Sequence, residues 1–246
     1  MALDAIAEAG FKHVGLMSAP TRSGLVITAE TPLDEAARAG EAAGRRGLRI
    51  PSVYGGDIPV RESLRAGVAA LRRLIDICAA AGAASLLMGG IGERDLYPRY
   101  YQAIAACCDY AAERKVLLTL KPHGGLNATG PECRAALATV AHANFQLWYD
   151  PGNILYYSDG KLDPVADAAT VDRLVTGMCI KDYRHPKRVD VTPGTGQVDF
   201  AGVIARLRRG GFTGGPLVIE TLSPATGADL IAEARKARRF VESLVR

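Results

Sequence analysis

Histidine, tryptophan and cysteine are scarce in this sequence. Its 246 residues include four histidines, one tryptophan and five cysteines. The number of cysteines is odd and no Cys-x-x-Cys pair occurs, which is typical of a reduced, cytoplasmic protein that uses cysteine as a small apolar residue. No signal peptide opens the chain and no apolar run approaches the roughly 18 residues of a membrane span, so we expect no membrane partner.

The sequence also lacks a strong charge of one sign. It has 30 basic and 26 acidic residues, a formal net charge of +4, and the excess is spread along the chain. A nucleic-acid partner would favour a concentrated basic patch, so we expect none. No Gly-x-Gly-x-x-Gly follows any expected strand, which argues against a nucleotide cofactor.

What the sequence does contain is one alternating pattern. Short apolar, β-rich segments are followed by amphipathic, alanine-rich segments in which apolar residues recur every three or four positions, as in a one-sided helix. Continuous apolar strands covered by helices indicate a parallel sheet. The expected strands are His13–Met17, Arg49–Val53, Ser85–Met88, Val116–Leu120, Phe145–Tyr149, Met178–Lys181 and Pro216–Glu220.

Polar residues gather where several of these strands end, which is where a barrel carries its chemistry. The pattern therefore predicts an α/β protein with one domain, residues 1–246, folded as a (β/α)8 TIM-type barrel. Seven strands are visible where a closed barrel has eight, so the first strand is either lacking or substituted. An incomplete barrel would gain from a partner subunit, and a homo-oligomer is a possible consequence.

The residues at the strand ends form a candidate site. In a strand, residues two apart share a face, so Lys121 and His123 point the same way, as do Cys179 and Lys181. Trp148 shares its face with Asp150, whereas Tyr149 should face the helices. The side chains expected to converge on one cavity are Lys121, His123, Asp150, Asn153, Cys179, Lys181 and Glu220.

The order of these segments resembles the xylose isomerase-like TIM-barrel superfamily, the sugar phosphate isomerase/epimerase group. The segments that carry the resemblance are AEAGFKHVGL, LTLKPHGG, YDPGN, CIKDY, PGTGQVDF and VIE, and together they extend over essentially the whole chain. The resemblance implies a divalent metal held by four strand-end ligands. By position these are Lys121, Asp150, Cys179 and Glu220, so only two of the family's ligand types are kept. The early family glutamate falls at Gly15.

Three interpretations of Lys121 follow. In the first, its ammonium group takes the place of the metal and pairs with Asp150 and Glu220, because buried charges must be paired. In the second, a metal binds through His123, Asp150 and Glu220 with Cys179 or water, and Lys121 is an acid or base whose pKa is lowered. Oxygen ligands favour Mn²⁺ or Mg²⁺, and a Cys179 ligand favours Zn²⁺. In the third, the site is degenerate.

The resemblance implies an isomerase or epimerase that acts on a keto sugar or sugar acid through an enediolate. Lys121, Glu220 and His123 are the candidate catalytic residues. A lyase, dehydratase or decarboxylase on a keto sugar or keto acid is the alternative, because an ammonium group can protonate a leaving group. A metal-free binding barrel is the other alternative. DNA repair like that of the endonuclease relatives is disfavoured because it requires a histidine-rich metal cluster.

Some residues around the site have other candidate roles. Asn153, Lys181, His185 and Trp148 are candidates for binding a carbohydrate substrate. Cys179 is also a candidate for plain packing inside the barrel. Asp199 is well placed to cap the helix that follows it.

Overall fold

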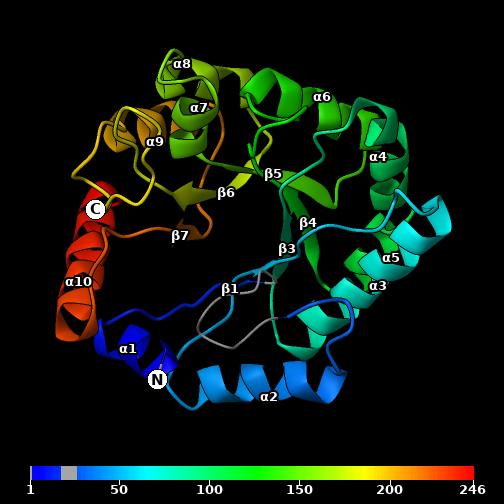
Figure 1. The fold of residues 1–246 in the computed structure, drawn as a ribbon, viewed down its shortest axis with the longest axis horizontal. Helices are drawn as coiled ribbons and strands as arrows, with labels where there is room; N and C mark the ends of the chain where they lie inside the picture. Colours follow the sequence, from blue (N-terminus) through cyan, green and yellow to red (C-terminus); the bar gives the residue numbers. More distant parts are fainter. Residues whose placement is uncertain (1, 18–26) are drawn as a thin grey trace.

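The computed structural model describes residues 2–17 and 27–246 of the chain. Seven strands lie in one sheet in the order of the sequence, and every neighbouring pair is parallel (Figure 1). The sheet curls into the α/β barrel architecture that the sequence predicts. The strands are β1 (Leu16–Met17), β2 (Val53–Tyr54), β3 (Ser85–Met88), β4 (Leu117–Leu120), β5 (Phe145–Tyr149), β6 (Val175–Ile180) and β7 (Leu217–Ile219).

All seven predicted strands exist, and β3 and β5 have the predicted bounds. The strands β1 and β2 are shorter than expected, since only an isolated parallel bridge joins His13 to Arg49 at their predicted starts. In contrast, β6 begins three residues earlier than predicted, at Val175 rather than Met178. The early part of β6 contains Thr176 and Gly177, which break the apolar run that marked the strand in the sequence.

The helices surround the sheet on its outer face (Figure 1). The apolar face of α3 is buried, with Leu71, Leu74 and Ile75 at most 2% exposed. Asp199 caps α9 by accepting the backbone N–H of Gly202, as predicted. The helices are α1 (Ala2–Glu8), α2 (Leu33–Gly44), α3 (Leu64–Ala80), α4 (Tyr97–Ala105), α5 (Cys108–Glu113), α6 (Gly130–Val140), α7 (Pro151–Tyr157), α8 (Pro164–Ala168), α9 (Phe200–Arg209) and α10 (Gly227–Leu244), with 3₁₀ turns η1 (Arg94–Leu96) and η2 (Ala169–Val171).

The barrel has a seam between its first and last strands. In the described part of the chain, β7 does not pair with β1 through backbone hydrogen bonds. The side chain of Val218 approaches the Gly15 backbone across this seam, with Cγ1 3.8 Å from where a Cβ on Gly15 would be. Outside the seam α1 packs against α10, where Arg238 donates to the carbonyl oxygen of Ala9 and Arg235 pairs with Glu8.

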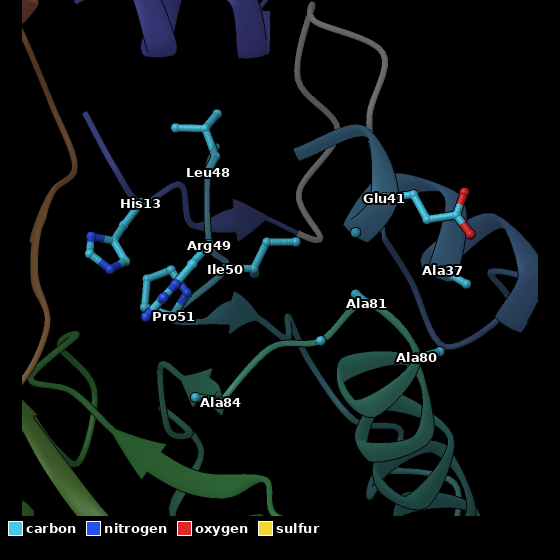
Figure 2. A pocket seen from close by; sticks show the side chains of 12 residues that line it. His13, Ala37, Glu41, Leu48, Arg49, Ile50, Pro51, Ala80, Ala81 and Ala84 are labelled. Atoms are coloured by element: carbon cyan, nitrogen blue, oxygen red, sulfur yellow. The ribbon is translucent and has the colours of Figure 1, made fainter. Parts of the chain in front are cut away.

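A cavity of about 640 Å³ opens at the amino ends of β1 to β3, next to α2 and the end of α3 (Figure 2). Its polar lining consists of His13, Glu41 and Arg49. Barrel enzymes place their chemistry at the opposite, carboxyl end of the strands. None of the helices in the described ranges combines the length and apolar character that a membrane span requires.

The contact between α2 and α3 depends on a residue without a side chain. A Cβ on Gly40 would lie 2.6 Å from the carbonyl oxygen of Ala81, whereas a Cβ on Gly44 would meet nothing within 4 Å. We therefore expect Gly40→Ala to lower the free energy of unfolding by about 1–3 kcal/mol, because the helices must separate.

The matched control is Gly44→Ala on the same helix, expected to raise the free energy of unfolding by about 0.5 kcal/mol. Urea denaturation of both variants measures the difference. Equal effects of the two substitutions would show that close approach at Gly40 does not hold these helices together.

Candidate active site

A ring of four charges, three of them buried and one, Glu220, partly buried, occupies the carboxyl end of the barrel. Lys121 follows β4, Asp150 follows β5, Lys181 follows β6 and Glu220 follows β7. Glu220 bridges the two lysines, with Oε1 bound to Lys121 Nζ and Oε2 at 2.7 Å from Lys181 Nζ. Asp150 Oδ2 lies 3.6 Å from both ammonium groups. We call these four side chains the ion ring.

The ion ring balances two positive charges with two carboxylates. The side chains of Lys121 and Asp150 are 3% and 0% exposed, so water screens them little. Coulomb interactions are much stronger in such surroundings than in water, and an unpaired member would be costly. Lys121 at the end of β4 thus neutralises the carboxylates that β5 and β7 bring to the same place.

Burial and the neighbouring charges shift the pKa of every side chain in the ion ring. Burial alone would lower the pKa of Lys121 and Lys181, but the acidic groups around them outweigh burial and raise it. Burial alone would raise the pKa of Glu220, but the two lysines overcome burial and hold it at about 2. Burial raises the pKa of Asp150 in spite of the lysines. The raised pKa of Lys121 is opposite to the one that a metal-assisted acid or base at this position requires.

His123 stands above the ring, exposed at the mouth of the barrel between two tyrosines. The ring centroids of Tyr54 and Tyr157 lie 6.1 and 6.0 Å from that of His123. Desolvation, followed by the charges of Lys121 and Lys181, lowers the pKa of His123 to about 4. The imidazole is therefore neutral near pH 7 and has a free lone pair for accepting a proton.

Asn153 connects two members of the site. Its side-chain Oδ1 accepts a hydrogen bond from Lys181 Nζ at 3.2 Å, and its Nδ2 donates to the carbonyl oxygen of Pro122 at 2.7 Å. Its backbone N–H donates to Asp150 Oδ1, which caps α7. Asn153 was predicted to bind substrate; in the structure its side chain is committed to holding Lys181 and the Lys121–His123 turn in place.

A second asparagine, which the sequence analysis missed, fixes the loop after β4. Asn127 is fully buried and donates from Nδ2 to the carbonyl oxygens of Gly89 and Lys121. Its own carbonyl oxygen accepts the backbone N–H of His123. Gly124 lies within this loop with φ +81°, a left-handed conformation that glycine adopts without strain. Only the two glycines in KPHGGLN signalled that the loop folds back on itself.

Asp182 organises the loop after β6. Its carboxylate is fully buried and accepts backbone N–H groups from Tyr183, Gly194, Gly196 and Val198. Four donors on one carboxylate satisfy it without a cation. The loop between Tyr183 and Val198 is thereby anchored directly next to Lys181.

The other predicted site residues take different places. Trp148, predicted to bind substrate, is 1% exposed and packs with Leu87 and Cys179 inside the barrel. The Tyr149 hydroxyl contacts Asp167 on the helix side, as the alternation predicted. His185 lies 3.4 Å from the Tyr183 hydroxyl, and its backbone donates to Gln197; neither partner belongs to the ion ring.

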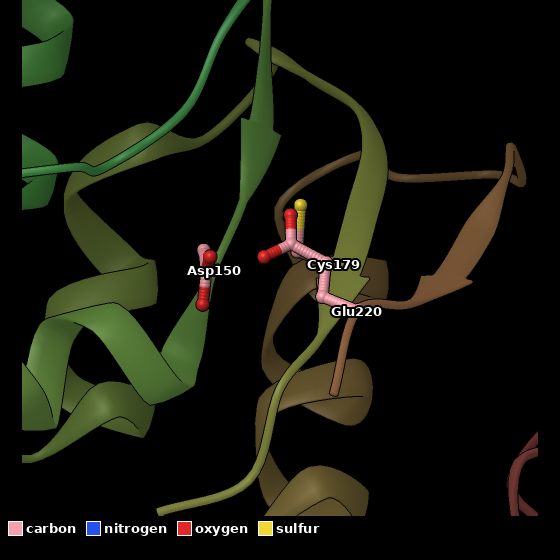
Figure 3. A group of neighbouring side chains, drawn as sticks. All are labelled: Asp150, Cys179 and Glu220. Atoms are coloured by element: carbon pink, nitrogen blue, oxygen red, sulfur yellow. The ribbon is translucent and has the colours of Figure 1, made fainter. Parts of the chain in front are cut away.

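Three of the four predicted metal ligands do cluster. Ligand atoms of Asp150, Cys179 and Glu220 lie within 4.8 Å of one another (Figure 3), and His123 is not part of this group in the described residues. These residues do not fit a divalent ion as they stand. Both carboxylates already pair with two ammonium groups, and burial raises the pKa of the Cys179 thiol far above that of a ready thiolate ligand.

The family model for the xylose isomerase-like TIM barrel matches residues 3–244. The chain therefore belongs to the xylose isomerase-like TIM-barrel family. No similar sequence is found among curated proteins.

Solved structures share the fold at low sequence identity. An L-ribulose 3-epimerase is 18% identical with a TM-score of 0.77, over 98% of this chain and 86% of that one. A probable 3-DHS dehydratase from Bacillus anthracis is 14% identical with a TM-score of 0.72, over 98% and 92%. A xylose isomerase-like TIM-barrel protein from Mycobacterium smegmatis in complex with magnesium is 19% identical with a TM-score of 0.77, over 98% and 86%.

The ion ring generates a stability prediction. Glu220→Gln keeps the shape of the side chain but leaves two buried ammonium groups with one carboxylate. We expect a loss of about 3 kcal/mol in the free energy of unfolding at pH 7, because removing one partner strands buried charge. Asp34→Asn on the exposed Asp34–Arg38 pair is the control, with an expected change within about 0.5 kcal/mol.

The pKa of Glu220 determines how the effect of Glu220→Gln on the free energy of unfolding changes with pH. The folded-state pKa of Glu220, about 2, is lower than its ordinary value of 4.5. Its contribution is therefore complete above about pH 5 and is lost as the pH falls towards 2. Urea denaturation at several pH values should show the gap between wild type and Glu220→Gln narrowing in acid. A gap that stays constant from pH 7 to pH 3 would contradict the ion ring.

Proposed function

We propose that the protein is an isomerase or epimerase that forms an enediolate from a small keto sugar or sugar acid, with Lys121 and Lys181 as the cations of the site. The observation that carries the proposal is the buried ion ring beneath a neutral His123 at the carboxyl end of the barrel. Ammonium groups fixed where negative charge develops stabilise an enolate oxygen without reorganisation of water.

The proton steps follow from this arrangement. His123 accepts the proton next to the substrate carbonyl, the electrons of the broken C–H bond form the C=C bond, and the carbonyl oxygen becomes an enediolate oxygen held by the lysine N–H donors. Return of the proton from His123 to the neighbouring carbon, together with transfer of the hydroxyl proton on the first carbon to the enediolate oxygen, completes an isomerisation. Protonation of the same carbon on its opposite face by water completes an epimerisation, after which the hydroxide that forms takes the proton from His123.

This proposal changes the role that the resemblance implied for Glu220. Both carboxylate oxygens of Glu220 are bound to ammonium groups, so neither is free to accept a proton from carbon. We therefore assign Glu220 and Asp150 to holding and neutralising the lysines. The base is then His123, whose lone pair stays available.

Elimination is a second candidate, supported by the two ammonium groups in one site. Loss of water from the enediolate requires a proton donor at the leaving hydroxyl, and Lys181 is a second N–H donor beside Lys121. The likeness in fold to a probable dehydratase supports the architecture alone. The products distinguish the reactions, since isomerisation conserves the substrate formula and elimination removes one water.

Turnover tests the proposal directly. Keto sugars and keto acids incubated in D₂O should gain deuterium next to the carbonyl, detected by NMR and mass spectrometry. Lys121→Met should reduce kcat/KM by about 10³-fold, because one electrostatic contact to a developing oxyanion contributes about 10²–10³-fold. Lys161→Met, at an exposed position, is the matched control. Substrate binding without any exchange would favour the metal-free binding barrel.

Removal of metal ions tests whether the lysines or a divalent metal supply the positive charge that the reaction requires. We expect full turnover after prolonged chelation and dialysis, because the lysines already neutralise both carboxylates. Elemental analysis of the dialysed protein verifies that the metal has been removed. Loss of activity that Mn²⁺, Mg²⁺ or Zn²⁺ restores would instead make Asp150, Cys179 and Glu220 the ligands of a working metal.

A further inference from the structure

Glu220 follows an edge strand. In the described part of the chain β7 pairs with β6 alone, and at the end of this pair the N–H of Glu220 donates to the carbonyl oxygen of Ile180 over 3.4 Å. This distance exceeds the roughly 2.7–3.2 Å of an ordinary N–H···O hydrogen bond. The strand alone therefore fixes the Glu220 carboxylate poorly, although each of its oxygens must reach an ammonium group.

Three side chains hold the chain just beyond Glu220, and we call Thr192, Ser223 and Glu233 the hydroxyl clamp. The backbone N–H of Thr192 donates to Ser223 Oγ, and the backbone N–H of Ser223 donates to Thr192 Oγ1, both at 3.0 Å. The Thr192 hydroxyl donates in turn to Glu233 Oε2 on α10. Because Thr192 is fully buried, loss of its hydroxyl would leave the N–H of Ser223 and this carboxylate oxygen without that partner.

The other side of the hydroxyl clamp leads to Lys181. Thr192 lies in the loop that Asp182 anchors, two residues before Gly194, whose N–H donates to Asp182 Oδ2 at 2.9 Å. Asp182 directly follows Lys181 in the chain. The hydroxyl clamp therefore joins the segments that follow two members of the ion ring, one three residues after Glu220 and one anchored at the residue next to Lys181.

The helix α10, which lies outside β7 (Figure 1), supports the hydroxyl clamp at two points. Glu233 accepts the Thr192 hydroxyl, and two turns later the ring of Phe240 lies so close to Gly194 that a Cβ there would come within 2.7 Å. Phe240 also packs edge-on against Phe200, with ring centroids 5.7 Å apart. The position of the loop that contains Thr192 is thus set by α10, without any pairing between β7 and β1.

We propose that Thr192 is a positioning residue for the candidate active site: its hydroxyl holds the segment after β7 against the loop after β6 and thereby keeps the Glu220 carboxylate between Lys121 and Lys181. The effect on the reaction rests on the proposed function. A displaced Glu220 would let both ammonium groups move from the place where the enediolate oxygen forms, and stabilisation of an oxyanion depends on donors that are already in position.

Three variants test this role. Thr192→Val removes the hydroxyl and keeps the shape of the side chain, whereas Thr192→Ser keeps the hydroxyl. Thr170→Val is the matched control, because the Thr170 hydroxyl donates to the carbonyl oxygen of Asp167, outside the ion ring.

Deuterium exchange from D₂O into D-fructose, D-ribulose and 5-keto-D-gluconate gives kcat and KM for the probe that exchanges fastest. We expect Thr192→Val to lower kcat about tenfold and to leave KM within about twofold, because misplaced charges weaken the stabilisation of the transition state more than the binding of substrate. Thr192→Ser and Thr170→Val should keep kcat within about twofold of the wild-type value.

A measurement without substrate separates the positioning role from the reaction. In ¹H–¹⁵N NMR spectra of the lysine ammonium groups, the signals of Lys121 and Lys181 should shift in Thr192→Val, because these protons report the hydrogen bonds to Glu220. The same signals should stay in place in Thr192→Ser and Thr170→Val. If Thr192→Val does not fold, Glu233→Ala removes the acceptor of the Thr192 hydroxyl at a side chain that is 29% exposed, and the same shifts are expected.

Unchanged lysine signals, an unchanged kcat, or equal losses of kcat in Thr192→Val and Thr170→Val would each overturn the positioning role of Thr192. Shifted lysine signals in a protein whose wild type exchanges deuterium into none of the three probes would instead reject the proposed function and leave the link between Thr192 and Glu220 standing.

Discussion

The requirement that buried charges be paired governs this molecule. Four strands of a parallel sheet each deliver one charged side chain to the same end of the barrel, and the result is stable only because cations and carboxylates alternate around the ion ring. Glu220, which contacts both lysines, carries most of this balance. The poor fit to a divalent ion depends on this pairing, whereas the neutral state of His123 depends on desolvation and on the two lysines, whose effect Glu220 opposes.

Residues around the ion ring hold its charged side chains in place. Asn153, Asn127 and Asp182 each bind backbone of a neighbouring loop, so the positions of Lys121 and Lys181 are set by hydrogen bonds as well as by the strands. The buried side chains of Asp182 and Asn153 cost little in this role, because their acceptor oxygens are satisfied, whereas Asn127 Oδ1 has no hydrogen-bond partner. The backbone positions of both lysines are therefore fixed, and few side-chain rotamers of each can reach Glu220.

Much of this arrangement could be predicted from the sequence. Seven apolar strands of parallel type, the barrel, and the convergence of Lys121, Asp150, Lys181 and Glu220 follow from period, burial and the geometry of strand ends, and they are confirmed. The lengths of β1 and β2 could not be predicted, because the hydrogen bonds of short strands depend on neighbours distant in sequence. Whether the pKa of Lys121 is raised or lowered could not be predicted either. Burial lowers this pKa and paired carboxylates raise it, and only the distances between the charges decide which effect is larger.

Asn127 and Asp182 were missed as supporting residues because their partners are backbone groups. Backbone carbonyls and N–H groups leave no mark in the residue types, so a sequence pattern shows that a loop turns but not which side chain closes it. Trp148 illustrates the converse: its alternation with Asp150 was correct, but depth along the barrel decides whether a residue lines a site or fills the interior, and alternation says nothing about depth.

The seam between β7 and β1 has a mechanical consequence for the ring. Neighbouring strands elsewhere in the sheet are joined by backbone hydrogen bonds, whereas the described residues at the seam meet through side chains, and the helices outside it through Arg235 and Arg238. In the described part of the chain, separation along this line breaks no strand pairing, so the barrel opens there at the least cost in backbone hydrogen bonds. Because β7 leads directly to Glu220, the residue that neutralises both lysines belongs to the edge of the barrel that parts first.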